Sequence, residues 1–367
     1  MTTGFQSFGK SALGVFNKST LGVRDDGVGP RVWFAGMSNS SQILYSAVAS
    51  GASGWAKTSL SGPRYPWWTY NGYTFGFALG SSGSKWSDLY VTANGITWAK
   101  RVTSSFTASP RMAKTASGRL ILTYSVGTIN DGTTVLYSDN YFTSYSTVST
   151  FTVPGYIQPS PIKQFAGGRL VFGLQSYSTP YWYSRVCYSD DNGASWNSVA
   201  LPSRAGWINN FFYDSSADTM YLVCRDFDPS SFLTNYLYSS TDGTTWTKIK
   251  DLSATDCSWN RSAQFFNHDS YRLSSGRIIC DMGGLDDTSM HVHYSDDNGQ
   301  TWHSGVTEWR PLRKKSGVLY TRKYNSGGID NKIVQSSDGS TWSDLVTLES
   351  LDTSDTIGLS MNDQEDN

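Results

Sequence analysis

A short phrase recurs along the chain about every 48 residues, and it restricts the fold more than any other feature of the sequence. Each copy has a strand-like start, a polar turn that contains Gly, and Trp three residues after that Gly. The copies are YSDDNGASW (188–196), YSDDNGQTW (294–302), YSSTDGTTW (238–246), VQSSDGSTW (334–342) and YVTANGITW (90–98). A regular repeat of this length with strand content indicates similar β-sheets that stack beside one another.

Two more segments continue the repeat in degenerate form. YSDNYFTSY (137–145) lacks the Gly, and YSAVASGASGW (45–55) carries an insertion. The aromatic residues that close the seven copies are Trp55, Trp98, Tyr145, Trp196, Trp246, Trp302 and Trp342. Strand-like runs such as PRMAKTA (110–116) and RLILTYS (119–125) precede the phrase, so each period holds four short strands. The sequence predicts an all-β protein: a single seven-bladed β-propeller with four-stranded antiparallel blades, with six blades as the alternative.

The two ends of the repeat complement each other. The first copy begins with RVWFAGM (31–37) and has no obvious strand before it, whereas residues 356–361 follow the last copy with no second strand after them. We expect residues 356–361 to supply the innermost strand of the first blade and so close the ring. The alternative places residues 19–26 there. The predicted divisions are a docking segment (1–27), the propeller (28–363) and a short tail (364–367).

The polar residues of the phrase look chemical, but a turn explains them. Asp and Asn side chains accept bonds from neighbouring backbone amides in tight turns, and Gly supplies a positive φ. A calcium loop would need Glu six residues after the Gly, where this chain has Gly305 and Val199. We therefore expect a structural turn, with the Trp packed back into the sheet.

The phrase, S-x-D-x-G-x-x-W, resembles the Asp-box of the sialidase and BNR-repeat propellers. The residues that match it in full are Ser189, Asp191, Gly193, Trp196, Ser295, Asp297, Gly299 and Trp302. The resemblance covers roughly residues 28–350. It implies that the boxes lie on the face opposite the ligand site. The loops from fourth to first strands, and from second to third strands, would then form the functional face.

Arginines accompany aromatic residues in the segments expected on that face. Guanidinium groups pair with carboxylate or phosphate, and indole rings stack on sugars. Packing between blades is the alternative role for each of them. The predicted ligand-binding residues are Arg64, Trp67, Arg111, Arg204, Trp207, Arg261 and Arg310, together with Tyr181 and Trp182 of the aromatic segment 176–184, expected to be an exposed loop.

The resemblance also implies a possible enzyme. Sialidases hold the substrate carboxylate with three arginines and use a Tyr nucleophile, activated by Glu, and an Asp acid. The segment 109–125 resembles the blade opening that carries the family's first Arg, but Pro precedes Arg111 and Met follows it. The only Glu near the expected face is Glu308, and spacing selects no Tyr–Glu pair. We therefore assign no catalytic residue, and predict no metal and no cofactor.

Composition bears on location and partners. The net charge is −1, which provides no field for nucleic acid. No apolar run reaches the ~18 residues of a membrane span, and the first residues lack the apolar core of a signal peptide. We therefore expect no nucleic-acid partner, no membrane insertion, and synthesis in a host cytoplasm without secretion.

The chain has 27 Asp but three Glu and is rich in Gly and aromatic residues, which resembles bacteriophage tail and fibre proteins. Residues 1–27 faintly resemble short docking segments of phage tail-tip proteins. The leading hypothesis is a virion protein of the phage tail that joins other tail proteins through this segment and binds a host-surface glycan or receptor. The alternatives are a sialidase-like glycoside hydrolase and a purely structural tail or adaptor propeller.

Overall fold

Every regular element in the described part of the chain is a β-strand, which confirms the predicted all-β class. The computed structural model describes residues 32–37, 42–47, 56–59, 65–71, 73–79, 86–92, 98–106, 110–125, 133–151, 159–178, 181–202, 205–226, 235–252, 270–283, 290–315, 317–325, 328–347 and 357–361. At several strand ends it describes the backbone alone. No helix in these ranges has the length and apolar character needed to cross a membrane.

The described strands form five antiparallel sheets of four strands and one of seven. In pairing order, the first comprises β27 (Ile357–Met361), β1 (Val32–Met37), β2 (Gln42–Ala47) and β3 (Ala56–Ser59). The second comprises β4 (Tyr65–Tyr70), β5 (Tyr73–Leu79), β6 (Trp86–Thr92) and β7 (Ala99–Phe106). The third comprises β8 (Arg111–Lys114), β9 (Leu120–Ser125), β10 (Thr133–Ser138) and β11 (Ser146–Phe151).

The next two sheets repeat this plan. The fourth comprises β12 (Lys163–Gln164), β13 (Leu170–Ser178), β14 (Tyr181–Ser189) and β15 (Asn197–Ala200). The fifth comprises β16 (Ala205–Asp214), β17 (Thr219–Asp226), β18 (Asn235–Ser240) and β19 (Thr247–Leu252).

The seven-stranded sheet is joined through one long strand. Its strands are β20 (Ser270–Arg272), β21 (Ile278–Gly283), β22 (Met290–Ser295), β23 (His303–Lys315), β24 (Val318–Asn325), β25 (Gly328–Ser336) and β26 (Ser343–Thr347). Residues 303–307 of β23 pair with β22, and residues 308–315 pair with β24. The strand thus ends one group of four and begins the next.

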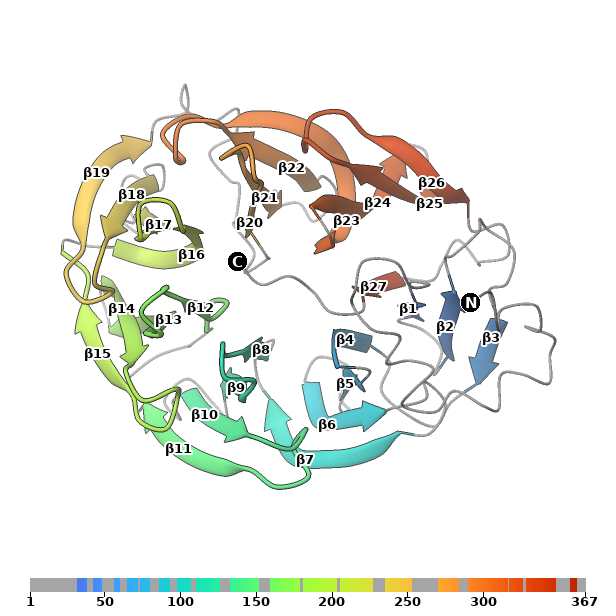
Figure 1. Ribbon diagram of the computed structural model, residues 1–367, viewed down its shortest axis with the longest axis horizontal. Helices are drawn as coiled ribbons and strands as arrows, with labels where there is room; N and C mark the ends of the chain where they lie inside the picture. The colour runs from blue at the N-terminus through green and yellow to red at the C-terminus, as the bar shows by residue number, and fades with distance from the viewer. Residues whose placement is uncertain are drawn as a thin grey trace, which may run out of the picture.

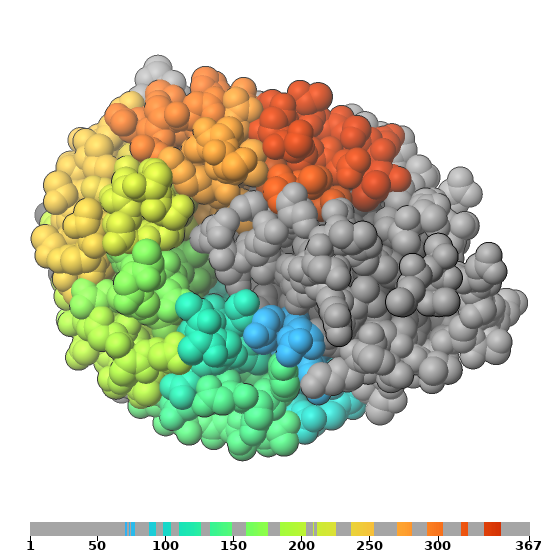
Figure 2. Space-filling model, in the orientation of Figure 1, coloured from blue at the N-terminus to red at the C-terminus, as the bar shows by residue number. Residues whose placement is uncertain are grey.

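The sheets stand side by side around a common centre (Figure 1). Strands β8, β12, β16 and β20 lie nearest the centre, whereas β11, β15 and β19 lie at the rim. In the same orientation, the coloured residues from about 100 to 340 form one continuous arc of packed side chains (Figure 2). A side chain near the common centre therefore has different neighbouring residues from a side chain that lies between two sheets.

The core lies between sheets, and β9 shows why. Its sequence, LILTYS, begins with three apolar residues in a row, and all six residues are buried. Leu120 and Leu122 pack with β5 and β6, whereas Ile121 packs with β13 and β14 on the other side. A strand covered on both faces reads as a continuous apolar run, as this one nearly does.

The last described strand pairs with the first described strand. Residues 357–361 of β27 run antiparallel to β1, with Met361 opposite Trp33 and Ile357 opposite Met37. The alternative occupant, residues 19–26, lies outside the described residues. So do residues 1–27 and 364–367, and the predicted division of the chain into domains stays a prediction.

Candidate functional site

The repeated phrase forms a closed network of hydrogen bonds. In the copy at 189–196, the Ser189 hydroxyl donates to Asp191 Oδ1 (2.8 Å) and accepts from the Gly193 amide (2.8 Å). Asp191 also accepts from the amide and the hydroxyl of Ser195. The Trp196 indole N–H donates to the Gly193 carbonyl (3.1 Å). The Ser, Asp, Gly and Trp that define the phrase thus all have hydrogen-bond partners within the turn.

The copy at 295–302 has the same geometry. Gly299 N donates to Ser295 Oγ (2.8 Å), Asp297 accepts from Thr301, and the Trp302 indole donates to Gly299 O (2.9 Å). Gly299 has a φ of +83°, and a Cβ there would lie 2.8 Å from the Phe212 ring of the preceding sheet. Gly is therefore required both by the backbone conformation and by close packing between sheets.

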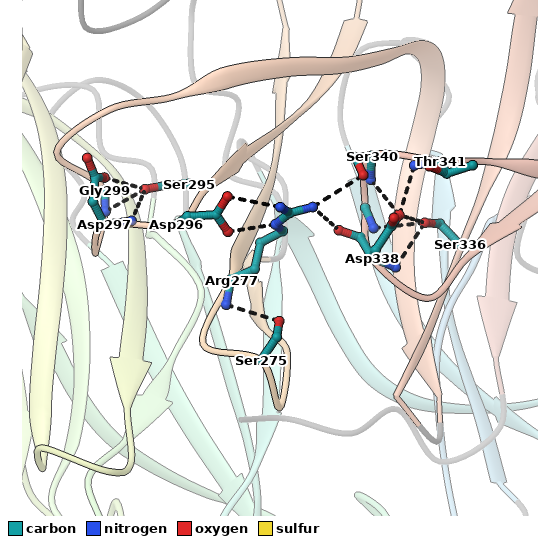
Figure 3. Close-up of polar contacts among 11 residues, drawn as sticks. Ser275, Arg277, Ser295, Asp296, Asp297, Gly299, Ser336, Asp338, Ser340 and Thr341 are labelled. Atoms are coloured by element: carbon teal, nitrogen blue, oxygen red, sulfur yellow. Dashed lines mark hydrogen bonds and ion pairs between the residues drawn. The ribbon is translucent and has the colours of Figure 1, made fainter.

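An arginine that sequence analysis did not single out joins neighbouring boxes (Figure 3). Arg277, at the start of the second strand, forms a bidentate pair with Asp296 (2.7 and 2.9 Å) and lies 4.3 Å from the Tyr294 ring centre. Its Nη1 also donates to the Asp338 carbonyl (3.0 Å) and to Ser340 Oγ (3.2 Å), both in the next box turn. We call this arrangement the arginine clasp.

The clasp occurs at two other junctions between sheets. Arg119 pairs with Asp139, stacks on Tyr137 and donates to Asn192 O (3.4 Å). Arg169 does the same with Asp190, Tyr188 and the Asp242 carbonyl. The sequence does contain a signal for these three arginines. The dipeptide Gly-Arg immediately precedes the second strand of each of the three sheets, at 118–119, 168–169 and 276–277.

Arg111 lies at the other end of its sheet. The box turn of the third sheet begins at Ser138, which pairs with Leu120, and Lys114 also pairs with Leu120. Arg111 begins β8 and pairs with Thr123, three residues farther along β9. Its side chain is buried, with 7% of its surface exposed. Arg111 thus lies at least three residues along β9 from the box turn and from the Arg119 clasp.

Three buried hydroxyl residues share a sheet face with Arg111. Thr123 lies opposite Arg111, Ser125 lies two residues farther along β9, and Thr133 of β10 pairs with Ser125. Paired residues, and residues two apart on one strand, point to the same side of a sheet. All four side chains are buried. We call Arg111, Thr123, Ser125 and Thr133 the Arg111 cluster.

The remaining predicted ligand-binding residues fall where side chains are not described. Arg64, Arg204 and Arg261 lie outside the described residues. For the others the structure gives the strand alone: β4 for Trp67, β14 for Tyr181 and Trp182, β16 for Trp207, and β23 for Arg310. Their convergence with Arg111 stays a prediction.

Two expectations about local structure were wrong. The aromatic segment 176–184, expected to be a loop, is mostly paired: Tyr177 lies opposite Trp182, and residues 176–178 and 181–184 belong to β13 and β14. Trp207 and Arg310, expected in loops, lie inside β16 and β23. Tyr, Trp and β-branched residues favour strands, so they lengthen the hairpins beyond the predicted ends.

The described residues hold no group of three or more His, Cys, Asp or Glu side chains placed to bind a metal ion. Of the four histidines of the chain, His291 and His293 lie on β22 and His303 begins β23.

Solved structures with the same architecture exist, although their sequences differ. A putative 6-phosphogluconolactonase from Bacteroides uniformis is 11% identical, with 90% of this chain and 97% of that chain covered and a TM-score of 0.53. A second, from Bacteroides fragilis, is 10% identical over 91% and 98%, with a TM-score of 0.51. An α-L-arabinofuranosidase from Fusarium graminearum is 18% identical over 64% and 79%, with a TM-score of 0.45. At such identities the first two show the fold alone, a β-propeller.

Sequence comparison, unlike these structures, identifies a family for the chain. No curated protein matches the chain. The BNR repeat-like domain matches residues 77–270, which is more than half of the chain and includes the box at 189–196. The chain therefore belongs to the BNR repeat-like family, as the Asp-box resemblance implied, and folds as a β-propeller.

Proposed function

We propose that this protein is a sialidase-like glycoside hydrolase that acts on a glycan with an acidic sugar. Family membership supports the class, since the resemblance connects Asp-box propellers with sialidases and other glycosidases. The observation that carries the proposal is the position of Arg111, buried at the start of an inner strand and at the end of its sheet opposite the box turn.

The chemistry of Arg111 suits an acidic sugar. A guanidinium group presents planar donors that match a carboxylate in a bidentate way, and its charge persists at any physiological pH. Burial shields the Arg111 guanidinium from bulk solvent, which strengthens its attraction for an anion. The carboxylate of a sialic or uronic acid would thus be held while the neighbouring glycosidic bond is cleaved.

Activity and binding should be measured on the same variants. We expect turnover of a fluorogenic sialoside or glucuronide, no turnover of the neutral galactoside, and a loss of at least about 100-fold in kcat/KM for Arg111→Met, which corresponds to about 2.7 kcal/mol. Lys248→Met, which removes a cation at the rim on β19, serves as the control. Neither turnover nor binding of any acidic glycan would sink the proposal.

Acidic-glycan binding without turnover would instead favour the receptor-binding hypothesis. That hypothesis, with its virion location, tail partners and N-terminal docking segment, rests on composition and on a resemblance of residues 1–27. The family match supports the hydrolase better, and the virion role stays a prediction.

We also propose that the propeller has seven blades and that β27 closes the ring. Division of the seven-stranded sheet at β23 gives two groups of four strands that share it, in addition to the five other sheets. Pairing of β27 with β1, and its contacts with β4 and β23, support closure at the junction of first and last blades.

A further inference from the structure

One face of the β8–β11 sheet changes from apolar to polar along its length. Toward the box turn, Ala113, Ile121 and Val135 pack against Phe172 and other apolar residues of the next sheet. The next residues on the same face, two positions farther from the box, are Arg111, Thr123 and Thr133. The apolar contact between these sheets therefore ends in a buried polar region.

Two hydroxyl groups in this region have no hydrogen-bond partner. Thr123 and Thr133 are fully buried, and the structure gives neither Oγ1 atom a bond to any residue that it describes. A buried hydroxyl without a partner destabilises a fold, because it has lost its bonds to water. Such a group in a native protein requires an explanation other than folding.

One internal repeat shows that the fold does not demand a hydroxyl at the Thr123 position. Thr123 lies three residues after Leu120, the partner of the box Ser138, and pairs with Val135. In the fifth sheet, Val223 lies three residues after Met220, the partner of the box Ser240, and pairs with Leu237. Val223 is buried in the apolar cluster between the fifth sheet and β20–β23. An isosteric apolar residue thus serves the same position elsewhere.

We propose that Thr123 and Thr133 are positioning residues, which hold a water molecule against Arg111 and thereby orient its guanidinium for the anionic group of the ligand. This inference rests on the proposed function of Arg111. Thr123 starts about 5 Å from its direct partner Arg111 and about 7 Å from its diagonal neighbour Thr133, so one water can bridge Thr123 to either group, and the long Arg111 side chain can cover the wider spacing to β10. A buried water needs two to four polar partners, which Arg111 and the two hydroxyls provide.

Matched substitutions separate this role from packing. Thr123→Val and Thr133→Val keep the shape and remove the hydroxyl, whereas Thr123→Ser and Thr133→Ser keep the hydroxyl. Val223→Thr adds a hydroxyl at the equivalent position far from Arg111. Each variant would be titrated with N-acetylneuraminic acid and with glucuronic acid in a calorimeter, and melted without ligand.

We expect each Val variant to bind at least about 10-fold more weakly than the parent without a loss of melting temperature, and each Ser variant to bind like the parent. Val223→Thr should melt at a lower temperature with unchanged affinity. Val variants that bind as tightly as the parent would overturn the inference. If the Val variants bind as tightly as the parent but Arg111→Met has lost binding, the proposed function survives and only the positioning role fails.

A crystal structure of the unaltered protein at about 1.5 Å resolution provides a test that needs no variant. We expect a water within hydrogen-bond distance of Thr123 Oγ1, Thr133 Oγ1 and the Arg111 guanidinium. Density that shows the two hydroxyls bonded elsewhere would overturn the inference, even if the Val variants failed to fold. If the correctly folded, unaltered protein binds neither acid, that result would count against the proposed function instead.

Discussion

At the scale of single residues, the Trp and the Gly of a box occupy adjoining space between two sheets. Trp302 is 3% exposed and contacts Phe212 of the preceding sheet, in the space beside Gly299. In the degenerate copy, Phe142 stands at the Gly position with a φ of 58° and is fully buried against Phe75. Tyr145, at the Trp position, is 43% exposed. Phe142 thus fills the place of the missing Trp.

This difference predicts unequal costs of truncation. Trp302→Ala should lower the free energy of unfolding by about 3–5 kcal/mol, because it empties a packed site between sheets. Tyr145→Ala, at the same position of the repeat, should cost less than about 1 kcal/mol. Denaturant unfolding of both variants measures the difference. Equal losses would show that the degenerate copy packs through its terminal aromatic after all.

The box carboxylates predict how stability depends on pH. Partial burial raises the pKa of Asp297, but hydrogen bonds from Thr301 and Ser295 outweigh it, so the pKa lies below its ordinary value. A carboxyl with a lowered folded pKa stabilises the protein above its unfolded pKa of about 3.9, and this contribution disappears as the pH falls through the folded value.

Asp297→Asn should therefore be less stable than the parent at pH 7, and the two should converge as the pH falls below about 4. Asp251→Asn, which removes an exposed carboxylate on β19, reports the effect of net charge alone. Urea unfolding between pH 7 and pH 2 gives the comparison. A difference between Asp297→Asn and the parent that is constant over this range would refute the role of the ionised carboxylate.

At the scale of elements, the arginine clasp links one sheet to the next. Arg277→Met should lower the free energy of unfolding by about 1–3 kcal/mol, because it removes charged hydrogen bonds to two partners at once. Lys248→Met removes a single exposed pair with Asp251 and should cost about 0–1 kcal/mol. If both variants lose equally little free energy of unfolding in thermal or chemical denaturation, the clasp does not stabilise the contact between sheets.

The clasp also shows what the sequence could and could not predict. The box was predictable because Ser295, Asp297 and Gly299 meet within one turn, where spacing determines contact. The clasp joins Arg277 to Asp338, 61 residues away, and no local pattern reveals that partner. The polar cluster beside Arg111 was missed for the same reason: its hydroxyls come from β9 and β10 and meet only through strand register.

At the scale of the whole molecule, the proposed closure of the ring depends on β27. Deletion of residues 353–367 should lower the melting temperature by several degrees, at roughly 2–4 °C for each kcal/mol lost, because β1 would lose one of its two partner strands. Deletion of residues 364–367 alone leaves β27 intact and should change little. Calorimetry of both truncations decides the matter. Identical melting of the two proteins would refute closure by β27.

We expect an acidic glycan to bind at the Arg111 end of the sheets, away from the boxes. The most direct measurement is a crystal structure of the protein soaked with an acidic oligosaccharide. We expect a sugar carboxylate within about 3 Å of the Arg111 guanidinium, as charged hydrogen bonds require. A sugar bound at the end that carries Trp196 and Trp302, or at the rim near β19, would contradict the account.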